Sequence, residues 1–188
     1  MTWPVQMKSL QGQLLIASPK LFDPNFFRAV VLLVQHGENG ALGLVLNRPL
    51  EMTIANAWEQ VSEMPCEATG LLHQGGPCDG PLMVLHTDAS IPEMTVIPQV
   101  FFTTDREDIQ QLVTQNHSKM KFFVGYAGWS PGQLESELED GGWLMTPCEN
   151  KHIFQVDDDL WPTLMREISE AIFSTLNPKV IPEDPTTN

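Results

Sequence analysis

Apolar residues fall into short runs that are separated by polar residues, glycine and proline. Runs of four to eight apolar residues between turn signals are typical of strands. The dipeptide Asn39-Gly40 predicts a tight hairpin between two of them. The sequence therefore predicts about eight strands, with a break at Pro98 in the sixth segment: 12–17, 29–36, 41–46, 71–74, 82–86, 95–103, 121–126 and 143–145.

Four other segments carry helix signals. A helix of two to three turns begins at Thr53, and a capping box of Thr104 and Glu107 opens a second helix. A capping box over 130–133, with proline at the first helical position, opens a third helix that ends at 141–142. Residues 160–176 place apolar side chains three and four residues apart, as in a helix with one buried face.

These elements do not alternate as a regular strand–helix–strand series, which argues against a simple doubly wound sheet. We expect an α+β (mixed α/β) fold, with a bent or barrel-like, largely antiparallel sheet surrounded by about four helices. A chain of 188 residues has the usual length of one domain. We expect residues 1–177 to form that single domain and the proline-containing end, 178–188, to be frayed.

The net charge of the chain limits the classes of partner that it can bind. The chain has 24 acidic and 10 basic residues, a formal net charge of -14. Such a surface is poorly suited to neutralising phosphates, and no helix-turn-helix with a basic second helix is visible, so direct DNA binding is disfavoured. The longest aliphatic run, 29–34, is far too short to cross a membrane. Three cysteines without a CxxC pair, and no signal peptide, indicate free thiols in the cytoplasm.

Unusual residue types gather where strands end. The predicted hairpin places Asn47 beside the start of the first hairpin strand, near Arg28, so that Arg28 and Arg48 flank one surface. A pair of guanidinium groups suits a carboxylate or a phosphate. The alternative is that each arginine pairs with one of the many acidic side chains.

Two further segments are rich in small residues. Gly75 and Gly76 permit close approach of a ligand to the backbone, although a plain tight turn explains them equally well. Trp129 lies between a strand and a helix start, where it could form a wall of the same site. His36 and His86 are alternative general bases. No histidine or cysteine spacing indicates a metal, and no glycine-rich motif indicates a nucleotide cofactor.

An ordered series of motifs resembles the AlgH/YqgE family of small bacterial proteins. The chain opens with GQLLIASP at 12–19 and DPNFFR at 23–28, and the most recognisable motif is GALGLVLNRP at 40–49. The motifs GGP, LH, GYAGW, GQLE and GWL follow at 75–77, 85–86, 125–129, 132–135 and 142–144. The resemblance implies a soluble α/β protein with a small barrel-like sheet. The family's frequent label of transcriptional regulator brings no catalytic residue or cofactor.

We therefore expect a non-enzymatic regulatory or adaptor module that binds a small anionic ligand or a protein partner in a cleft. Arg28 and Arg48 would hold the anion, Asn47 would orient it, and Trp129 would form a wall. Two alternatives remain. One is an enzyme with His36 or His86 as general base, and the other is a regulator that binds DNA directly.

Overall fold

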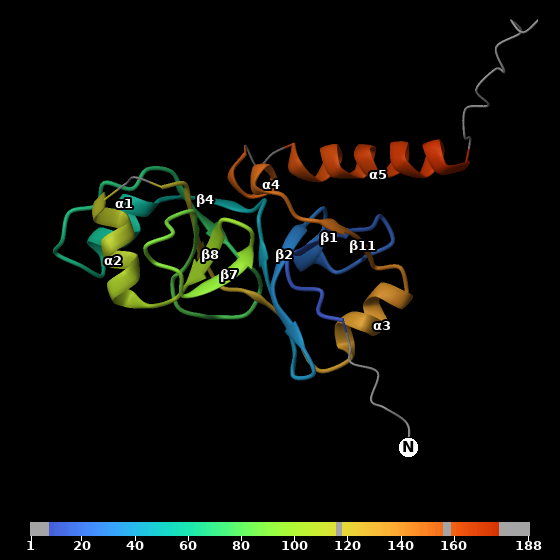
Figure 1. Cartoon of the computed structure of the whole chain (residues 1–188), viewed down its shortest axis with the longest axis horizontal. Helices are drawn as coiled ribbons and strands as arrows, with labels where there is room; N and C mark the ends of the chain where they lie inside the picture. Colours follow the sequence, from blue (N-terminus) through green and yellow to red (C-terminus); the bar gives the residue numbers. More distant parts are fainter. Residues whose placement is uncertain (1–7, 116–117, 156–158, 177–188) are drawn as a thin grey trace, which may run out of the picture.

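Two sheets form the centre of the fold in the computed structural model, which describes residues 8–115, 118–155 and 159–176 (Figure 1). The first sheet has the strand order β10-β3-β2-β1-β11 and is antiparallel throughout. Its strands are β1 (Gln13–Ala17), β2 (Val30–Gly37), β3 (Gly40–Val45), β10 (Ala127–Trp129) and β11 (Trp143–Pro147). β2 and β3 form the hairpin that Asn39-Gly40 predicts.

The second sheet has the order β4-β5-β9-β6-β8-β7. β5 and β9 are parallel, and its other neighbours are antiparallel. Its strands are β4 (Pro49–Thr53), β5 (Leu71–Gln74), β6 (Met83–His86), β7 (Met94–Ile97), β8 (Val100–Thr103) and β9 (Met120–Val124). The predicted α+β class with largely antiparallel pairing is confirmed, and the strands are divided between two sheets.

Helices lie around the sheets (Figure 1). They are α1 (Ile54–Glu59), α2 (Arg106–Gln115), α3 (Gln133–Glu139), α4 (Asn150–Phe154), α5 (Leu160–Leu176) and a 3-10 turn, η1 (Pro24–Phe26). α1 and α2 cover the outer side of the second sheet, whereas α5 runs along the first sheet near β1 and β11. The bounds of α5 agree with the predicted helix.

Both predicted capping boxes need correction. α2 begins one residue later than predicted, so the carboxylate of Asp105 accepts hydrogen bonds from the backbone N–H groups of Glu107 (2.8 Å) and Asp108 (3.1 Å). At α3 the side chain of Gln133 does accept from the Ser130 N–H, but the helix begins at Gln133 after a left-handed Gly132. Proline is therefore outside that helix and not at its first position.

Three elements gave no clear sequence signal. β4 begins at Pro49, which an edge strand tolerates at its first position because no N–H is required there. β10 has three residues, and α4 has five. Such short segments carry too few side chains to show a period. The predicted frayed tail, 178–188, and part of the acidic run 157–159 lie outside the described residues.

The first sheet is covered by apolar layers on both faces. Alternate β2 side chains enter opposite layers: Val31 and Leu33 pack with Trp129 and Trp143, whereas Val30 and Leu32 pack toward the second sheet and α5. This explains the uninterrupted apolar run of β2, because a strand buried on both faces needs no polar positions. α1 and α2 bury a third cluster against the second sheet.

Candidate functional site

A short segment before β2 is held in place by the residues that follow β3. The side-chain amide of Asn47 accepts from the Val30 N–H at 2.9 Å and donates to the Arg28 carbonyl at 2.8 Å. Arg48 donates from Nη2 to the carbonyl of Phe27. The antiparallel hairpin brings these residues together, so the predicted proximity of Arg28 to Asn47 and Arg48 is confirmed.

The backbone of Arg28 is in the left-handed region, with φ of 54°. Side chains with a Cβ rarely adopt this conformation, which costs on the order of 1 kcal/mol or more. The neighbouring bonds from Asn47 keep the residue there. Backbone strain that is retained in this way is often found where a protein presents a functional side chain.

Aromatic rings surround the guanidinium of Arg28. Its Cζ lies 5.2 Å from the ring centroid of Phe27 and 5.3 Å from that of Trp161. Trp161, on α5, is itself held by a 2.9 Å hydrogen bond from Nε1 to the carbonyl of Ala17. Cation–π contacts of this length are attractive and orient the cation. Arg28 is therefore exposed to solvent but fixed in position.

Arg48 is half-buried beside the same segment, and burial lowers its pKa below the ordinary arginine value. Arginine remains charged at neutral pH despite such a change. Within residues 8–115, 118–155 and 159–176, no acidic side chain forms an ion pair with Arg28 or Arg48. Arginine–acid pairing, the alternative considered for these two residues, is not found in that part of the chain.

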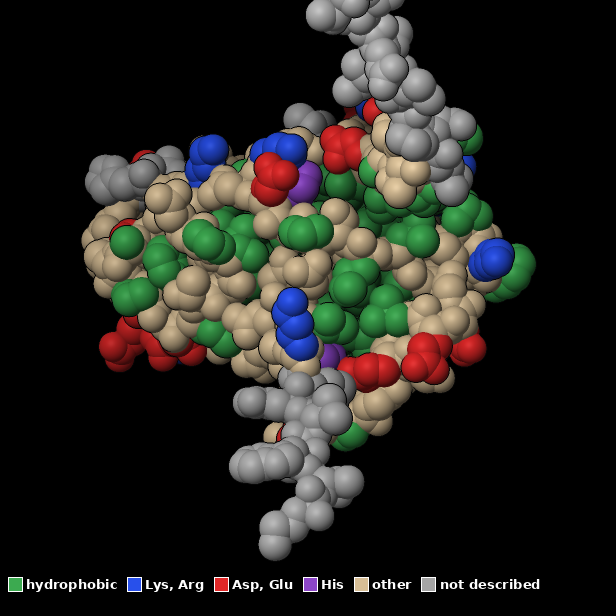
Figure 2. Space-filling model, turned by 45° about the vertical axis from the view of Figure 1, so that its right-hand side comes forward, with side chains coloured by type: hydrophobic (Ala, Val, Ile, Leu, Met, Phe, Trp, Pro, Cys, Tyr) green, Lys and Arg blue, Asp and Glu red, His purple; other side chains and the backbone are tan. Residues whose placement is uncertain are grey.

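A hollow of about 510 Å³ adjoins Arg28 through Phe27. It is lined by residues of the connection between β1 and β2: Pro19, Leu21, Phe22, Asp23, Pro24 and Phe27. Phe22 is 92% exposed and Phe27 is 62% exposed. We call Phe22, Phe27, Arg28, Arg48 and Trp161 the Arg28 surface. On the face drawn in Figure 2, cationic side chains are few and scattered, and hydrophobic side chains are spread across its middle.

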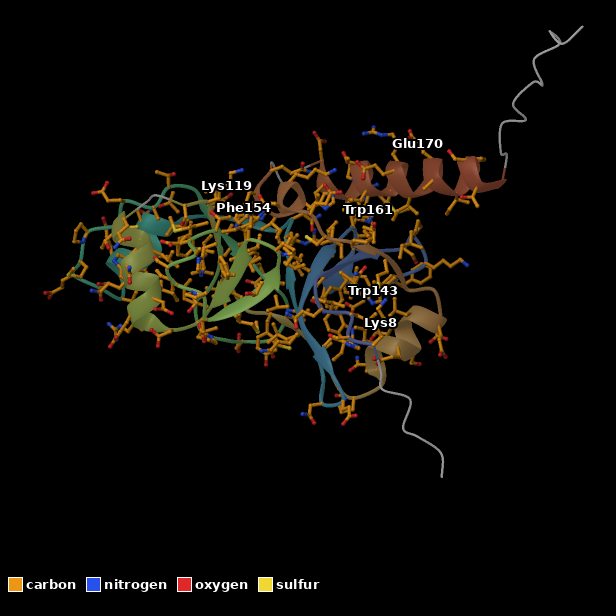
Figure 3. The ribbon with its side chains drawn as sticks, viewed as in Figure 1. Lys8, Lys119, Trp143, Phe154, Trp161 and Glu170 are labelled. Atoms are coloured by element: carbon orange, nitrogen blue, oxygen red, sulfur yellow. The ribbon has the colours of Figure 1, made fainter. Side chains whose placement is uncertain are left out.

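The ring of Phe26 packs against two buried tryptophans and so holds the segment that carries Phe27 and Arg28. The ring lies 6.2 Å from Trp129 and 5.3 Å from Trp143, and both indoles donate to the same Glu137 oxygen, at 3.0 and 2.8 Å. Trp143 and Trp161 lie on opposite sides of the first sheet (Figure 3). Trp129 is only 6% exposed. Trp129 contacts Phe26 and Glu137, and the structure does not bring it to the Arg28 surface.

Gly75 and Gly76 are buried where the two sheets meet. Gly75 accepts from the Val45 N–H and donates to the Val124 carbonyl. A Cβ on Gly75 would lie 2.3 Å from the Gly125 carbonyl oxygen, and one on Gly76 would lie 2.1 Å from the carbonyl carbon of Tyr126. Close passage of two backbone segments explains these glycines, and neither lines the hollow beside Phe27.

The two candidate bases are also buried. His36 accepts from the Leu10 N–H at Nδ1 (3.1 Å), and its Nε2 lies 2.7 Å from a carboxylate oxygen of Glu135. Both of its ring nitrogens are thus engaged. His86 is fully buried and packs on Phe101. Burial lowers the pKa of His86 more than nearby Asp88 and Asp108 raise it.

Another cavity, which has polar side chains in its lining and a volume of about 350 Å³, lies between β5, β9 and α4. Its lining includes Lys119, which lies near Phe154 of α4 (Figure 3), and the buried side chains of His73 and Lys121. Sequence reasoning missed this site. The only signal was a lysine within the apolar run of β9, at a position that the strand buries.

Membrane-spanning helices and clusters of metal ligands are both absent from residues 8–115, 118–155 and 159–176. No three histidine, cysteine, aspartate or glutamate side chains lie together there as ligands for an ion. None of the helices in those ranges is both long enough and apolar enough to cross a bilayer.

Comparison with known proteins identifies relatives across most of the chain. A family model described as AlgH-like matches residues 14–172. A UPF0301 protein of Chlorobaculum tepidum is 36% identical over 162 residues, which cover 82% of this chain and 84% of that protein. A UPF0301 protein of Streptomyces avermitilis is 34% identical across the full length of both chains.

Solved structures agree with these matches. The solution structure of the AlgH protein from Pseudomonas aeruginosa has a TM-score of 0.73 and 28% identity, and covers 96% of this chain and 97% of its own. A Corynebacterium diphtheriae protein solved by crystallography has a TM-score of 0.67 and 26% identity, with 86% and 88% covered. The resemblance seen in the sequence motifs is confirmed, and the chain belongs to the AlgH-like family.

Proposed function

We propose that this protein is a non-enzymatic regulatory or adaptor module that binds an anionic group at the Arg28 surface. The observation that carries the proposal is that two guanidinium groups, Arg28 and Arg48, lie on two segments joined by hydrogen bonds, without an acidic partner among the described residues. Arginine donors that are oriented in advance bind carboxylate or phosphate at a reduced entropic cost. Asn47 supports the site by fixing the backbone, and not by contacting the ligand.

Geometry favours binding over catalysis. A histidine that acts as a general base needs a ring nitrogen that can reach the substrate. His36 uses both of its ring nitrogens in contacts within the protein, and His86 is fully buried. Direct DNA binding is disfavoured by the net charge of -14, because two arginines contact too few phosphates to offset the repulsion. A role as regulator would then act through a ligand or a protein partner.

We also propose that the protein works in the cytoplasm. We further propose that it forms a single domain that extends to about residue 177. All three cysteines, Cys66, Cys78 and Cys148, are free in the structure. Free thiols are typical of a reducing compartment. The packing of α5 against the first sheet supports its inclusion in the domain.

Titration of the isotopically labelled protein by NMR tests the binding site. We expect a library of anionic metabolites, with inorganic phosphate and citrate as reference anions, to shift the amides of 27–30 and the indole signal of Trp161. Arg28→Gln and Arg48→Gln should each weaken binding by about tenfold. Arg166→Gln, an exposed α5 arginine, is the control for net charge. Shifts that are absent, or spread evenly over the surface, would refute the proposal.

A further inference from the structure

We infer that the anionic ligand is an acidic segment of a protein partner, and that an apolar side chain of this segment enters the hollow beside Phe22. The inference rests on the proposed function and names the class of ligand. It combines two features that a small metabolite would not use together, the cationic pair and the apolar hollow next to it.

The hollow and the two arginines share Phe27 as a neighbour. Phe27 lines the hollow, contacts the Arg28 guanidinium at 5.2 Å and accepts a hydrogen bond from Arg48 through its carbonyl. A ligand that meets the arginines therefore also reaches Phe27. The volume of about 510 Å³ is larger than that of one apolar side chain, and the hollow is open to solvent.

Exposure of Phe22 and Phe27 indicates that a larger partner covers them. Phe22 is 92% exposed, and two phenylalanines so accessible on one connection are costly in water. A small anion bound at Arg28 would leave Phe22 uncovered. A peptide that places an apolar side chain beside an acidic one would bury the rings and neutralise the arginines at once.

The positive charge of the two arginines favours an acidic peptide over a neutral or a basic one. A guanidinium held against ring faces donates its N–H groups in its own plane, where a carboxylate accepts two of them. Lys20 is exposed within the same connection, where its charge offsets that of Asp23, which lines the hollow. An anionic membrane could also receive exposed phenylalanines and cations, but its extended anionic surface is repelled by the whole protein, whose net charge is -14. A short acidic segment interacts mainly with the arginines that it contacts, because charges farther away are screened by salt.

The connection is rigid enough to act as a preformed surface. Asp23 accepts from the Asn25 N–H at the start of η1, Phe26 packs on Trp129 and Trp143, and Asn47 holds both sides of Arg28. Little conformational entropy is then lost when a peptide binds.

Selection from a random peptide phage library on the immobilised full-length protein tests the inference. Enriched peptides should carry aspartate or glutamate next to leucine, isoleucine, phenylalanine or tryptophan. Synthetic copies should bind Arg28→Gln and Phe22→Ser variants about tenfold more weakly than the wild type. Arg166→Gln and Phe173→Ser, exposed on α5, are matched controls that should keep full affinity. NMR spectra of each variant establish that it is folded.

Several outcomes would overturn the inference. Enrichment of basic or uncharged peptides would exclude the acidic segment, and equal binding to the Phe22→Ser variant would exclude the hollow. Metabolite shifts at 27–30 without any selected peptide would retain the proposed function but reject the peptide ligand. Absence of both would reject the two proposals together. Sedimentation with phosphatidylserine vesicles that depends on Phe22, without a selected peptide, would identify a membrane as the partner.

Discussion

Asn47 encloses Arg28 by bonding the backbone on both sides of it, at the carbonyl of Arg28 itself and at the N–H two residues later. A short polar side chain at the end of β3 thereby fixes the backbone of a segment far from it in sequence. Substitution of Asn47 therefore tests the contribution of these two bonds.

Asn47→Ala should lower the free energy of unfolding by about 1–3 kcal/mol, because two backbone groups lose their partners. Urea denaturation measures the change, and Asn56→Ala, at an exposed position of α1, should change it by less than about 0.5 kcal/mol. Asn47→Asp keeps the acceptor but loses the donor, so we expect an intermediate effect. An Asn47→Ala protein as stable as the wild type would contradict the importance of these bonds.

Arg28→Gly and Arg28→Ala both remove the guanidinium, but only alanine keeps the penalty of the left-handed backbone. We expect the glycine variant to be about 1 kcal/mol more stable than the alanine variant. Thermal unfolding of the pair measures this difference without interference from the lost ring contacts, which both variants share. Equal stability would mean that the backbone at this position is unstrained.

Gly75→Ala should be among the most damaging small substitutions in the chain. Its Cβ would lie 2.3 Å from the backbone oxygen of Gly125 and 3.0 Å from a methyl group of the buried Leu44, so we expect a loss of about 3 kcal/mol or more. Gly37→Ala is the control, since no atom lies within 4 Å of a Cβ there and its φ is not left-handed. Chemical denaturation and the yield of folded protein compare the two. Tolerance of Gly75→Ala would contradict the close crossing.

Acid should destabilise the protein partly through His86. Burial lowers its pKa in the folded state, so the unfolded chain binds a proton more readily. Its contribution to stability is complete above the ordinary histidine pKa of about 6.5 and is lost as the pH falls below that value. His86→Leu should make the free energy of unfolding less dependent on pH between about 7.5 and 5.5.

His152, whose pKa is also lowered by burial, acts in the same direction and leaves part of the slope in place. The double variant His86→Leu, His152→Leu should therefore be less pH-dependent still. An unchanged slope in His86→Leu would show that His86 takes up its proton without unfolding.

Several features of the fold were predictable from local pattern. The β2–β3 hairpin follows from the Asn39-Gly40 turn between two apolar runs, and α5 follows from its spacing of apolar residues. The proximity of Asn47 to Arg28 also follows from the antiparallel pairing, although a β-bulge between Leu33 and Gln35 shifts the register of the two strands. β10 and α4 were not predictable, since three to five residues cannot show a period.

The contacts of the candidate site also divide into those that the sequence predicts and those that only the tertiary structure shows. Sequence alone determined that Asn47 and Arg48 lie beside the segment that ends at Arg28, because that placement depends on one local hairpin. Only the tertiary structure decided that Trp129 packs beneath Phe26, that Gly75 marks a backbone crossing, and that Trp161 contacts Arg28. Each of these contacts joins segments that are distant in the chain. Their geometry depends on how two sheets and α5 pack together, and local propensity carries no information about that packing.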